Sequence, residues 1–401
     1  MILTTLPRPK IAVAIGSVFL IAVFLLYSRA LPYPVLASQK HALLETEDAG
    51  LAFPYDPVPR RDFASLSRYP AQNANEPSKF AFSTLYCSRN PDVRGPYFES
   101  TQSIIWRILW SEYRSKYPII IFVCPFIPEK NRQIFRGQGA IVKEIELLDN
   151  IIPDDKISTK RWIDVLSKLN LWKQIEWKRI VFLDSDAFPV MNIDDIFDLP
   201  EQQCKKDALL PEDKAVVDSE RGKDMCSYIY AGVPHFTIDN INAGMFIMKP
   251  NLDMHAKLIR AAKRTEDYDV RYMEQGVLGS KNAFAEEGPF PVNRLPSVWN
   301  TVPEYYKEHL NKGPGSTEPP IRILHAKMWN RFWGSWNNLT HLNDVWDLDW
   351  MKMCRFFDSD EFLQARTTGV YETPLEKFVK AQAQAQAQQN QSQSQKQGMA
   401  S

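Results

Sequence analysis

The chain of 401 residues carries 48 Lys and Arg residues against 48 Asp and Glu residues, so its formal charge at neutral pH is zero. That balance excludes a protein that holds nucleic acid through a strongly basic surface. Hydrophobic residues make up 44% of the chain and aromatic residues 12%, which excludes a wholly disordered protein. The length suits two or three domains, or one large α/β domain with additional segments.

The N-terminal region contains a long apolar segment. Ile11 to Tyr27 includes no charge, Asn or Gln, and as a helix it spans about 26 Å, close to the hydrocarbon core of a thin bilayer. Arg8 and Lys10 precede it, which predicts a cytosolic tail at 1–10 and a lumenal body. A cleaved secretory signal is the alternative interpretation. We therefore expect a single-pass type II protein of the Golgi or ER membrane.

Cysteines and glycosylation sequons are consistent with that compartment. In an oxidising lumen two disulfides would leave one thiol, and Cys204 with Cys226, which flank a charged insertion, form the first expected pair. The alternative is that several cysteines are small buried hydrophobic residues. Two triplets, Asn338-Leu-Thr340 and Asn390-Gln-Ser392, match the N-glycosylation sequon. The five cysteines, which show no metal-binding spacing, are Cys87, Cys124, Cys204, Cys226 and Cys354.

Composition divides the remainder into three parts. Residues 28–78 are rich in Pro, Ala and charges without a sustained period, which predicts a stem between the anchor at 11–27 and the body. At the other end the Ala/Gln alternation of Ala381 to Lys396 contains no apolar residue larger than Ala, so we expect 376–401 to be disordered. One globular domain is left, at 79–375.

Within 79–375, apolar β-type runs alternate with helical patterns. This alternation predicts an α/β fold with a mostly parallel sheet and helices on both faces. Such sheets bind ligands beyond the carboxyl ends of their strands. The expected strands are Lys79–Tyr86, Tyr117–Val123, Ile141–Leu147 and Arg179–Leu183, and the expected helices are Tyr97–Tyr117 and Thr159–Trp172.

Two acidic residues follow the expected strand at Arg179–Leu183. Asp184 and Asp186 stand at i and i+2 where the strand leaves the sheet, so their oxygens can converge on one hard cation. Two carboxylates beside a low-dielectric sheet repel each other unless a cation is present. The pair therefore indicates a divalent metal site.

The run KRIVFLDSDAFPVMNIDDIFDLP resembles the Asp-x-Asp segment of glycosyltransferase family 8, the glycogenin-like enzymes with a GT-A (Rossmann-like) fold that use UDP-sugars and manganese. With the apolar N-terminal segment, the resemblance indicates a membrane-anchored, fungal-type member. Segments in the order of the family agree with it over about residues 79–340. The donor contacts that the resemblance implies are Leu85, Tyr86, Tyr97, Lys168, Asp184, Ser185, Asn242, Ala243, Gly244, Lys327 and Arg331.

The resemblance also implies the full ligand set. In the family a His after a strand is the third protein ligand, which here is His325 beside Asp184 and Asp186. The implied ion is Mn²⁺, with Mg²⁺ as the alternative. Arg331 stands where the family usually has Lys, and its guanidinium can also neutralise a diphosphate.

The reacting carbon of the sugar is expected near the segment Met273-Glu274-Gln275-Gly276, which resembles the family's Asp-Gln-Gly. The family retains anomeric configuration. The residues expected to act on the sugar are Asp239, Glu274 and Gln275, with the nucleophile unassigned because Arg271 replaces a further family Asp.

The expected function is transfer of a hexose, N-acetylhexosamine or hexuronic acid from a UDP-sugar to a glycan, glycoprotein or glycolipid, with no nucleic-acid partner. Two alternatives remain at this point: a catalytically silent lumenal binding protein on the same fold, and a nucleotidyltransferase that makes nucleotide sugars. The tryptophans at 329, 333 and 336 are more typical of core packing than of sugar stacking.

Overall fold

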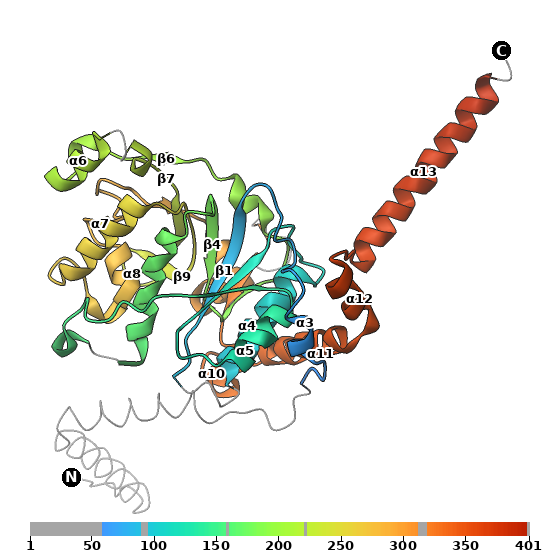
Figure 1. Ribbon diagram of the computed structural model, residues 1–401, viewed down its shortest axis with the longest axis horizontal. Helices are drawn as coiled ribbons and strands as arrows, with labels where there is room; N and C mark the ends of the chain where they lie inside the picture. Colours follow the sequence, from blue (N-terminus) through green and yellow to red (C-terminus); the bar gives the residue numbers. More distant parts are fainter. Residues whose placement is uncertain (1–57, 90–94, 158–159, 220–222, 312–318, 399–401) are drawn as a thin grey trace, which may run out of the picture. The chain divides into compact units, whose positions relative to one another are not determined.

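The computed structural model describes residues 58–89, 95–157, 160–219, 223–311 and 319–398 (Figure 1). Its centre is a seven-stranded sheet with the order β10-β8-β9-β4-β1-β2-β3. The pairs β10-β8, β4-β1, β1-β2 and β2-β3 are parallel, and β9 runs antiparallel to β4 and β8. The expected α/β class with a mainly parallel sheet is confirmed.

The strands match the buried apolar runs of the sequence, and the helices differ more from expectation. The helix expected over Tyr97–Tyr117 ends at Leu109, and the one expected over Thr159–Trp172 is a 3-10 helix. The strands of the main sheet are β1 (Phe80–Tyr86), β2 (Ile119–Val123), β3 (Ile141–Glu144), β4 (Arg179–Leu183), β8 (Tyr230–Pro234), β9 (Ile241–Met248) and β10 (Asn293–Arg294). Two further ladders pair β5 (Ala187–Pro189) with β11 (Ile323–His325), and β6 (Gln202–Gln203) with β7 (Ser227–Tyr228).

The α-helices are α3 (Phe63–Leu66), α4 (Pro96–Leu109), α5 (Glu129–Gly137), α6 (Pro211–Val217), α7 (Leu252–Lys263), α8 (Met273–Leu278), α9 (Pro303–Asn311), α10 (Arg331–Trp336), α11 (His341–Asp358), α12 (Asp360–Thr368) and α13 (Pro374–Gly398). The 3-10 helices are η1 (Asp154–Lys156), η2 (Lys160–Lys173), η3 (Asp194–Asp198), η4 (Lys206–Ala208), η5 (Lys223–Met225), η6 (Val270–Tyr272) and η7 (Ser297–Trp299).

Helices cover both faces of the sheet (Figure 1). On one face the Tyr86 ring lies 5.7 Å from Phe98 of α4 and 5.5 Å from Phe135 of α5. On the other face Phe246 of β9 stacks on Trp172 of η2 at 5.9 Å, and α7 and α8 pack beside η2. Alternate residues of each strand therefore enter two separate apolar layers, which fixes the register of the sheet.

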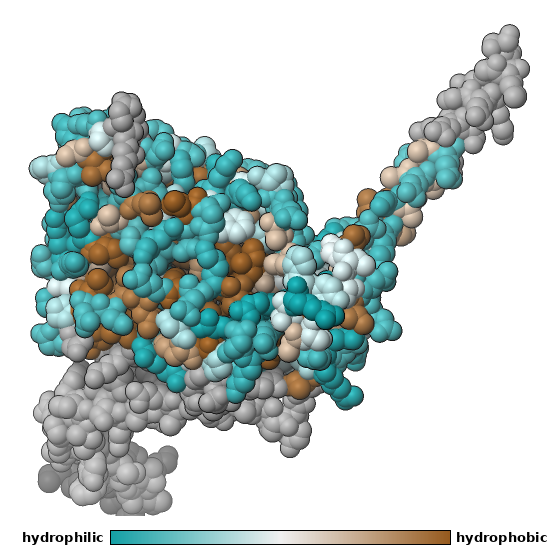
Figure 2. All heavy atoms as spheres, in the orientation of Figure 1, coloured by the Kyte–Doolittle hydropathy of each residue, from teal (hydrophilic) through white to brown (hydrophobic). Residues whose placement is uncertain are grey.

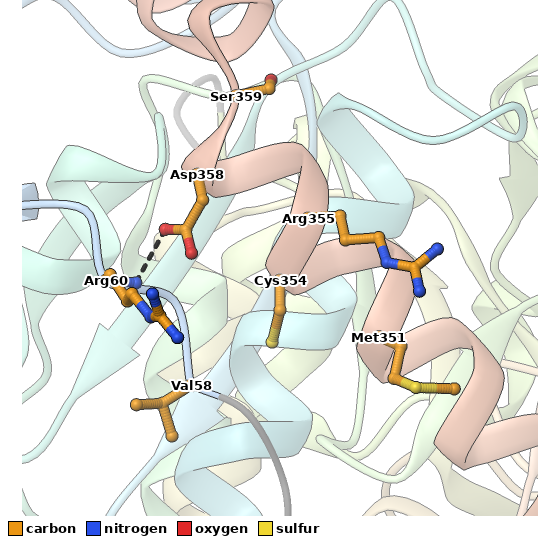
Figure 3. A pocket seen from close by; sticks show the side chains of 7 residues that line it. All are labelled: Val58, Arg60, Met351, Cys354, Arg355, Asp358 and Ser359. Carbon is orange, nitrogen blue, oxygen red and sulfur yellow. Dashed lines mark hydrogen bonds between the residues drawn. The ribbon is translucent and has the colours of Figure 1, made fainter.

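The segment expected as a stem contributes in part to this packed unit. Phe63 is buried, with its ring 5.4 Å from Phe357. The backbone N–H groups of Arg60 and Arg61 donate to the Asp358 carboxylate at 2.7 and 3.0 Å. Residues 58–78 thus belong to the folded body, because the apolar side chains of α3 are buried against α11 and α12. A cavity of about 380 Å³ lies at this junction (Figure 3), lined by Val58, Arg60, Met351, Cys354, Arg355, Asp358 and Ser359.

The C-terminal region is helical where disorder was expected, since α13 runs from Pro374 to Gly398. Ala and Gln are good helix formers, and a helix satisfies its own backbone groups without burying side chains. Residues 381–388 are exposed accordingly. The face drawn in Figure 2 is largely hydrophilic, with apolar side chains gathered in its central part.

The expected anchor at 11–27 and tail at 1–10 lie outside the described residues. Among the described residues we find no helix that combines the length and the hydropathy needed to cross a bilayer.

The cysteines form two disulfides. Cys204 pairs with Cys226 at a Cα–Cα distance of 4.8 Å, as expected, and Cys87 pairs with Cys124 at 5.1 Å. Cys354 is buried and belongs to neither disulfide. The first bridge fastens the start of the charged insertion to its end, and the second joins the chain after β1 to the chain after β2.

Candidate active site

Asp184, Ser185 and Asp186 follow β4 at the carboxyl edge of the parallel strands. The chain then enters β5, which pairs antiparallel with β11 so that His325 lies opposite Ala187. This register brings the His325 Nε2 atom to 3.1 Å from Asp186 Oδ1. One ligand atom each from Asp184, Asp186 and His325 lies within 4.8 Å of the others. The structure therefore assembles, from residues far apart in sequence, the three side chains to which the sequence assigns a metal.

A hydrogen-bonded chain behind His325 fixes its orientation. His325 Nδ1 lies 2.9 Å from Asn300 Oδ1, and Asn300 Nδ2 donates to Asn242 Oδ1 at 3.1 Å. Asn242 Oδ1 also accepts from the Gly244 N–H at 2.8 Å. Because the amide of Asn300 donates to an oxygen, its own oxygen faces the imidazole and accepts from Nδ1–H. With Nδ1–H engaged by Asn300, Nε2 is the nitrogen that faces Asp186: it can donate a proton to that carboxylate, or give its lone pair to a cation bound between them.

Gly244 allows the imidazole to lie directly on strand β9. A Cβ atom at this position would lie 2.2 Å from His325 Cε1 and 2.8 Å from Nδ1, which no side chain can occupy. The Gly244 carbonyl also accepts from the Asp184 N–H at 2.7 Å. One glycine thus contacts the backbone of one proposed ligand and the ring of another.

Lys168 of η2 is buried between two acids. Its Nζ donates to Asp184 Oδ1 at 2.7 Å and to Glu274 Oε1 at 2.8 Å, and its side chain is 4% exposed. Burial disfavours the ammonium, but the two carboxylates outweigh that effect and raise the pKa of Lys168. Lys168 therefore orients Asp184 and leaves the second oxygen of this carboxylate for a cation. The sequence assigned Lys168 to the donor, and in the structure its ammonium pairs with Asp184 and Glu274.

The electrostatics of the cluster favour the ionised form of Asp186. Burial by itself raises the pKa of Asp186, but His325 and Lys327 outweigh it and hold that pKa at about 2. For His325 the carboxylate of Asp186 outweighs burial and raises the pKa. Two carboxylates and an imidazole nitrogen form a mixed oxygen and nitrogen set that fits a divalent cation such as manganese.

Other expected donor contacts surround this edge of the sheet. Gln275 Oε1 accepts from the Ala243 N–H at 2.9 Å, which joins the start of α8 to β9. Tyr97, at the start of α4, has its ring 5.4 Å from Trp329 and 5.6 Å from the Lys327 ammonium. Leu85 is half-buried, but Tyr86 is buried with its ring between α4 and α5. The Tyr86 side chain thus belongs to the core rather than to a donor surface.

Two expected site residues pair elsewhere. The Asp239 side chain is 86% exposed and pairs with Arg294 at 2.5 Å. Arg331 pairs with Asp347 of α11 at 2.7 Å, so its guanidinium is directed to that helix. The structure therefore does not bring Asp239 or Arg331 to the cluster.

Sequence reasoning missed Asn300. It follows η7, is 0% exposed and joins His325 to β9. A single buried Asn in a loop has no distinctive spacing, so the only signal in the sequence was a polar pair, Asn300-Thr301, within an otherwise apolar run.

Comparison with known proteins now identifies the class. A model of the glycosyl transferase family 8 matches residues 97–337, which is more than half of the chain. The chain belongs to glycosyl transferase family 8, and the family expected from the sequence motifs is confirmed.

The relatives vary in how much they share with the chain. Galactinol synthase 1 of Arabidopsis thaliana is 29% identical over 38% of this chain and 46% of its own length. Galactinol synthase 2 of the same plant is 28% identical over 56% of this chain and 68% of its own length. An uncharacterised protein of Schizosaccharomyces pombe is 27% identical over 64% of this chain and 75% of its own length. The chain thus spans about half the length of the first of these relatives.

Among solved structures, an active-site mutant of LgtC has a TM-score of 0.42 at 16% identity, covering 66% of this chain and 95% of that one. The apo structure of the bifunctional glycosyltransferase WbbM has a TM-score of 0.43 at 12% identity, and the match covers 69% of this chain and 52% of WbbM.

Proposed function

We propose that this protein transfers a sugar from a UDP-sugar to a glycan, glycoprotein or glycolipid, with Asp184, Asp186 and His325 holding a manganese ion. The observation that carries the proposal is the assembly of these side chains at the carboxyl edge of the sheet, with His325 fixed by Asn300. Family membership supports glycosyl transfer. Two relatives carry the name galactinol synthase, and for this reason we choose a galactosyl donor as the first UDP-sugar to test.

The bound ion would stabilise the charge that develops on the diphosphate leaving group. The protein contributes the geometry: Lys168 orients Asp184, and Asn300 presents Nε2 of His325. Lys327 places a further positive charge near Asp186, whose pKa it lowers. These residues are positioned before the donor binds, so little reorganisation accompanies the reaction.

Gln275 is the best candidate for contact with the sugar. Its oxygen is engaged by the Ala243 N–H, so its remaining polar group is an amide NH₂ that can donate to hydroxyl oxygens. Glu274 is buried against Lys168, and Asp239 is paired with Arg294. Both carboxylates are paired with a cationic side chain in this structure, and we assign no nucleophile to the retaining reaction.

We further propose the lumen of the Golgi or ER as the location, with the anchor at 11–27. Two disulfides support an oxidising compartment. The complete ligand set argues against a catalytically silent binding protein, because a binding role alone needs no metal ligands of this arrangement.

The test is hydrolysis of a panel of UDP-sugars by the purified full chain, with and without a chelator. We expect activity that needs Mn²⁺ and falls by at least about 100-fold in Asp186→Ala. The matched control is Asp198→Ala, which removes an exposed carboxylate further along the same segment. Activity that survives chelation, or an equal loss in both variants, would contradict the assignment.

A further inference from the structure

Trp336 is the most exposed large hydrophobic side chain among the described residues, at 80%. It ends helix α10, and its ring lies 6.2 Å from that of Phe332, which is 57% exposed. Neighbouring apolar rings that share one exposed surface are a candidate contact site, unlike a single exposed apolar residue. Trp329 of the same segment is buried and Trp333 is half-buried, so the exposure of Trp336 needs a separate explanation.

The turn after Trp336 displays Asn338. The Leu339 N–H donates to the Gly334 carbonyl at 2.7 Å, and the Asn338 N–H donates to the Ser335 carbonyl at 3.1 Å. These are the two bonds of a Schellman motif, in which Asn is favoured at the left-handed position, and Asn338 has a φ of 56°. Leu339 is buried, whereas Asn338 and Thr340 are exposed. The Asn338 side chain can therefore carry a large substituent without loss of a backbone hydrogen bond.

Asn338, Leu339 and Thr340 form an N-glycosylation sequon. We propose that Asn338 carries an N-linked glycan whose first N-acetylglucosamine packs on the ring of Trp336, two residues earlier. The apolar CH face of a sugar packs on an aromatic ring. Because the sugar is tethered to the same turn, its effective concentration at the ring is high. The glycan would cover apolar surface that otherwise faces water.

The modification is a transfer from a lipid-diphosphate oligosaccharide by the host's own enzyme. The Asn338 Nδ2 atom attacks C1 of the first sugar, the bond from C1 to the diphosphate oxygen breaks, and Nδ2 loses one proton as the lipid diphosphate leaves. This inference rests on the secretory location proposed above and not on the transferase activity. The two disulfides support that location independently of the sequon.

The first experiment translates the full chain in a cell-free system with and without ER microsomes. We expect a glycosidase-sensitive gain in mass that Asn338→Gln and Thr340→Ala abolish. The matched control is Thr340→Ser, which keeps the sequon and should keep the gain. Asn390→Gln removes the second sequon and should leave the glycan at Asn338 in place.

Protease protection and a non-reducing gel in the same reactions separate the possible failures. A chain that is protected and disulfide-bonded but carries no glycan at Asn338 overturns the glycan alone. A chain that stays accessible to protease overturns the location and the glycan together, while UDP-sugar hydrolysis by the purified protein still tests the proposed function.

The second experiment tests the packing on Trp336 by a double-mutant cycle in protein from a eukaryotic secretory host. In glycosylated protein, Trp336→Ala should lower the Tm by about 2 °C, and in the Asn338→Gln background it should change the Tm by much less. Equal effects in the two backgrounds overturn the packing. If Trp336→Ala raises the acceptor KM and its effect on the Tm does not depend on the glycan, Trp336 belongs to acceptor binding. That result would also overturn the proposed packing of the glycan on its ring.

Discussion

Asn300 determines which nitrogen of His325 is available to a metal. Its oxygen accepts from Nδ1–H, and its amide is held by Asn242. We expect Asn300→Ala to weaken Mn²⁺ binding by roughly 10–100-fold, the usual cost of removing such a partner. Calorimetric titration of the purified protein with Mn²⁺ measures this effect without reference to activity.

The control is Asn300→Asp, which restores an acceptor for Nδ1–H and should recover most of the affinity. Unfolding curves of both variants in the absence of metal separate a loss of fold from a loss of binding, because Asn300 is fully buried. Unchanged Mn²⁺ affinity in Asn300→Ala would show that the hydrogen bond does not orient the ligand.

Particular residues show what the sequence could and could not establish about the site. Asp184 and Asp186 follow a buried strand directly, so local sequence predicts where their carboxylates converge. His325 could be predicted as the third ligand only from the resemblance to the family. Its distance from the two aspartates depends on the pairing of β5 with β11, which no local pattern indicates. The pairing of Lys168 with Glu274 depends on how η2 packs against α8. No local pattern encodes that contact.

At the scale of elements, α7 contacts η2 through a histidine whose pKa is lowered by burial. His255 Nε2 lies 2.8 Å from Asn170 Oδ1, and Asn170 Nδ2 donates to the Glu146 carbonyl at 2.8 Å. The Asn170 oxygen is therefore an acceptor, and His255 donates to it from a neutral ring. Burial, assisted by the charge of Lys173, lowers the pKa of His255 to about 4.

This shift has a definite sign. Between pH 6.5 and 4 the unfolded chain binds a proton at His255 that the folded chain does not, so acidification through this range favours unfolding. We expect the Tm to fall between pH 7 and pH 5 by roughly 2–4 °C more in the natural protein than in His255→Gln. Gln retains an N–H donor for Asn170 but does not titrate. If calorimetry shows that the Tm of the two proteins falls equally between pH 7 and pH 5, His255 is not the group responsible.

Strands were easier to predict than helices for a physical reason. β1, β2 and β4 are nearly continuous apolar runs, because both faces of a parallel sheet are covered. By contrast, α13 was expected to be disordered, since its Ala and Gln residues bury almost nothing. Helix formation needs only backbone hydrogen bonds and favourable propensity, so the absence of a core face did not exclude it.

At the scale of the whole molecule, segments far apart in the sequence hold the fold together. The Arg366 guanidinium of α12 donates to the carbonyls of Gly137 and Arg136 at 3.0 Å, of Pro70 at 2.6 Å and of Tyr69 at 2.9 Å. These carbonyls lie at and beyond the C-terminal ends of α5 and α3, where a cation is favourable. Arg107 of α4 pairs with Asp349 of α11 in the same layer. The helices after the family match are thus part of the core.

The smallest stable unit should consequently be larger than the region that matches the family. We expect a fragment of residues 97–337 to be insoluble or unfolded, because it lacks β1, which lies between β2 and β4. It also leaves the buried Arg107 without Asp349, and removing one partner of such a pair costs about 3–5 kcal/mol. A fragment of residues 58–372 retains all of these contacts and should unfold cooperatively.

The same comparison tests α13. Deleting it breaks three ion pairs with the body, of Arg114 with Glu376, Lys377 with Glu361 and Lys380 with Glu372. At least one partner of each pair is exposed, and such pairs are worth about 0–1 kcal/mol each. The Tm of 58–372 should therefore lie close to that of 58–401 in calorimetry, while Arg366→Met in either fragment should lower it strongly. Arg355→Met, which removes an exposed guanidinium from α11, is the matched control. A cooperative, soluble 97–337 fragment would show instead that the α3, α11 and α12 layer is an accessory to the fold.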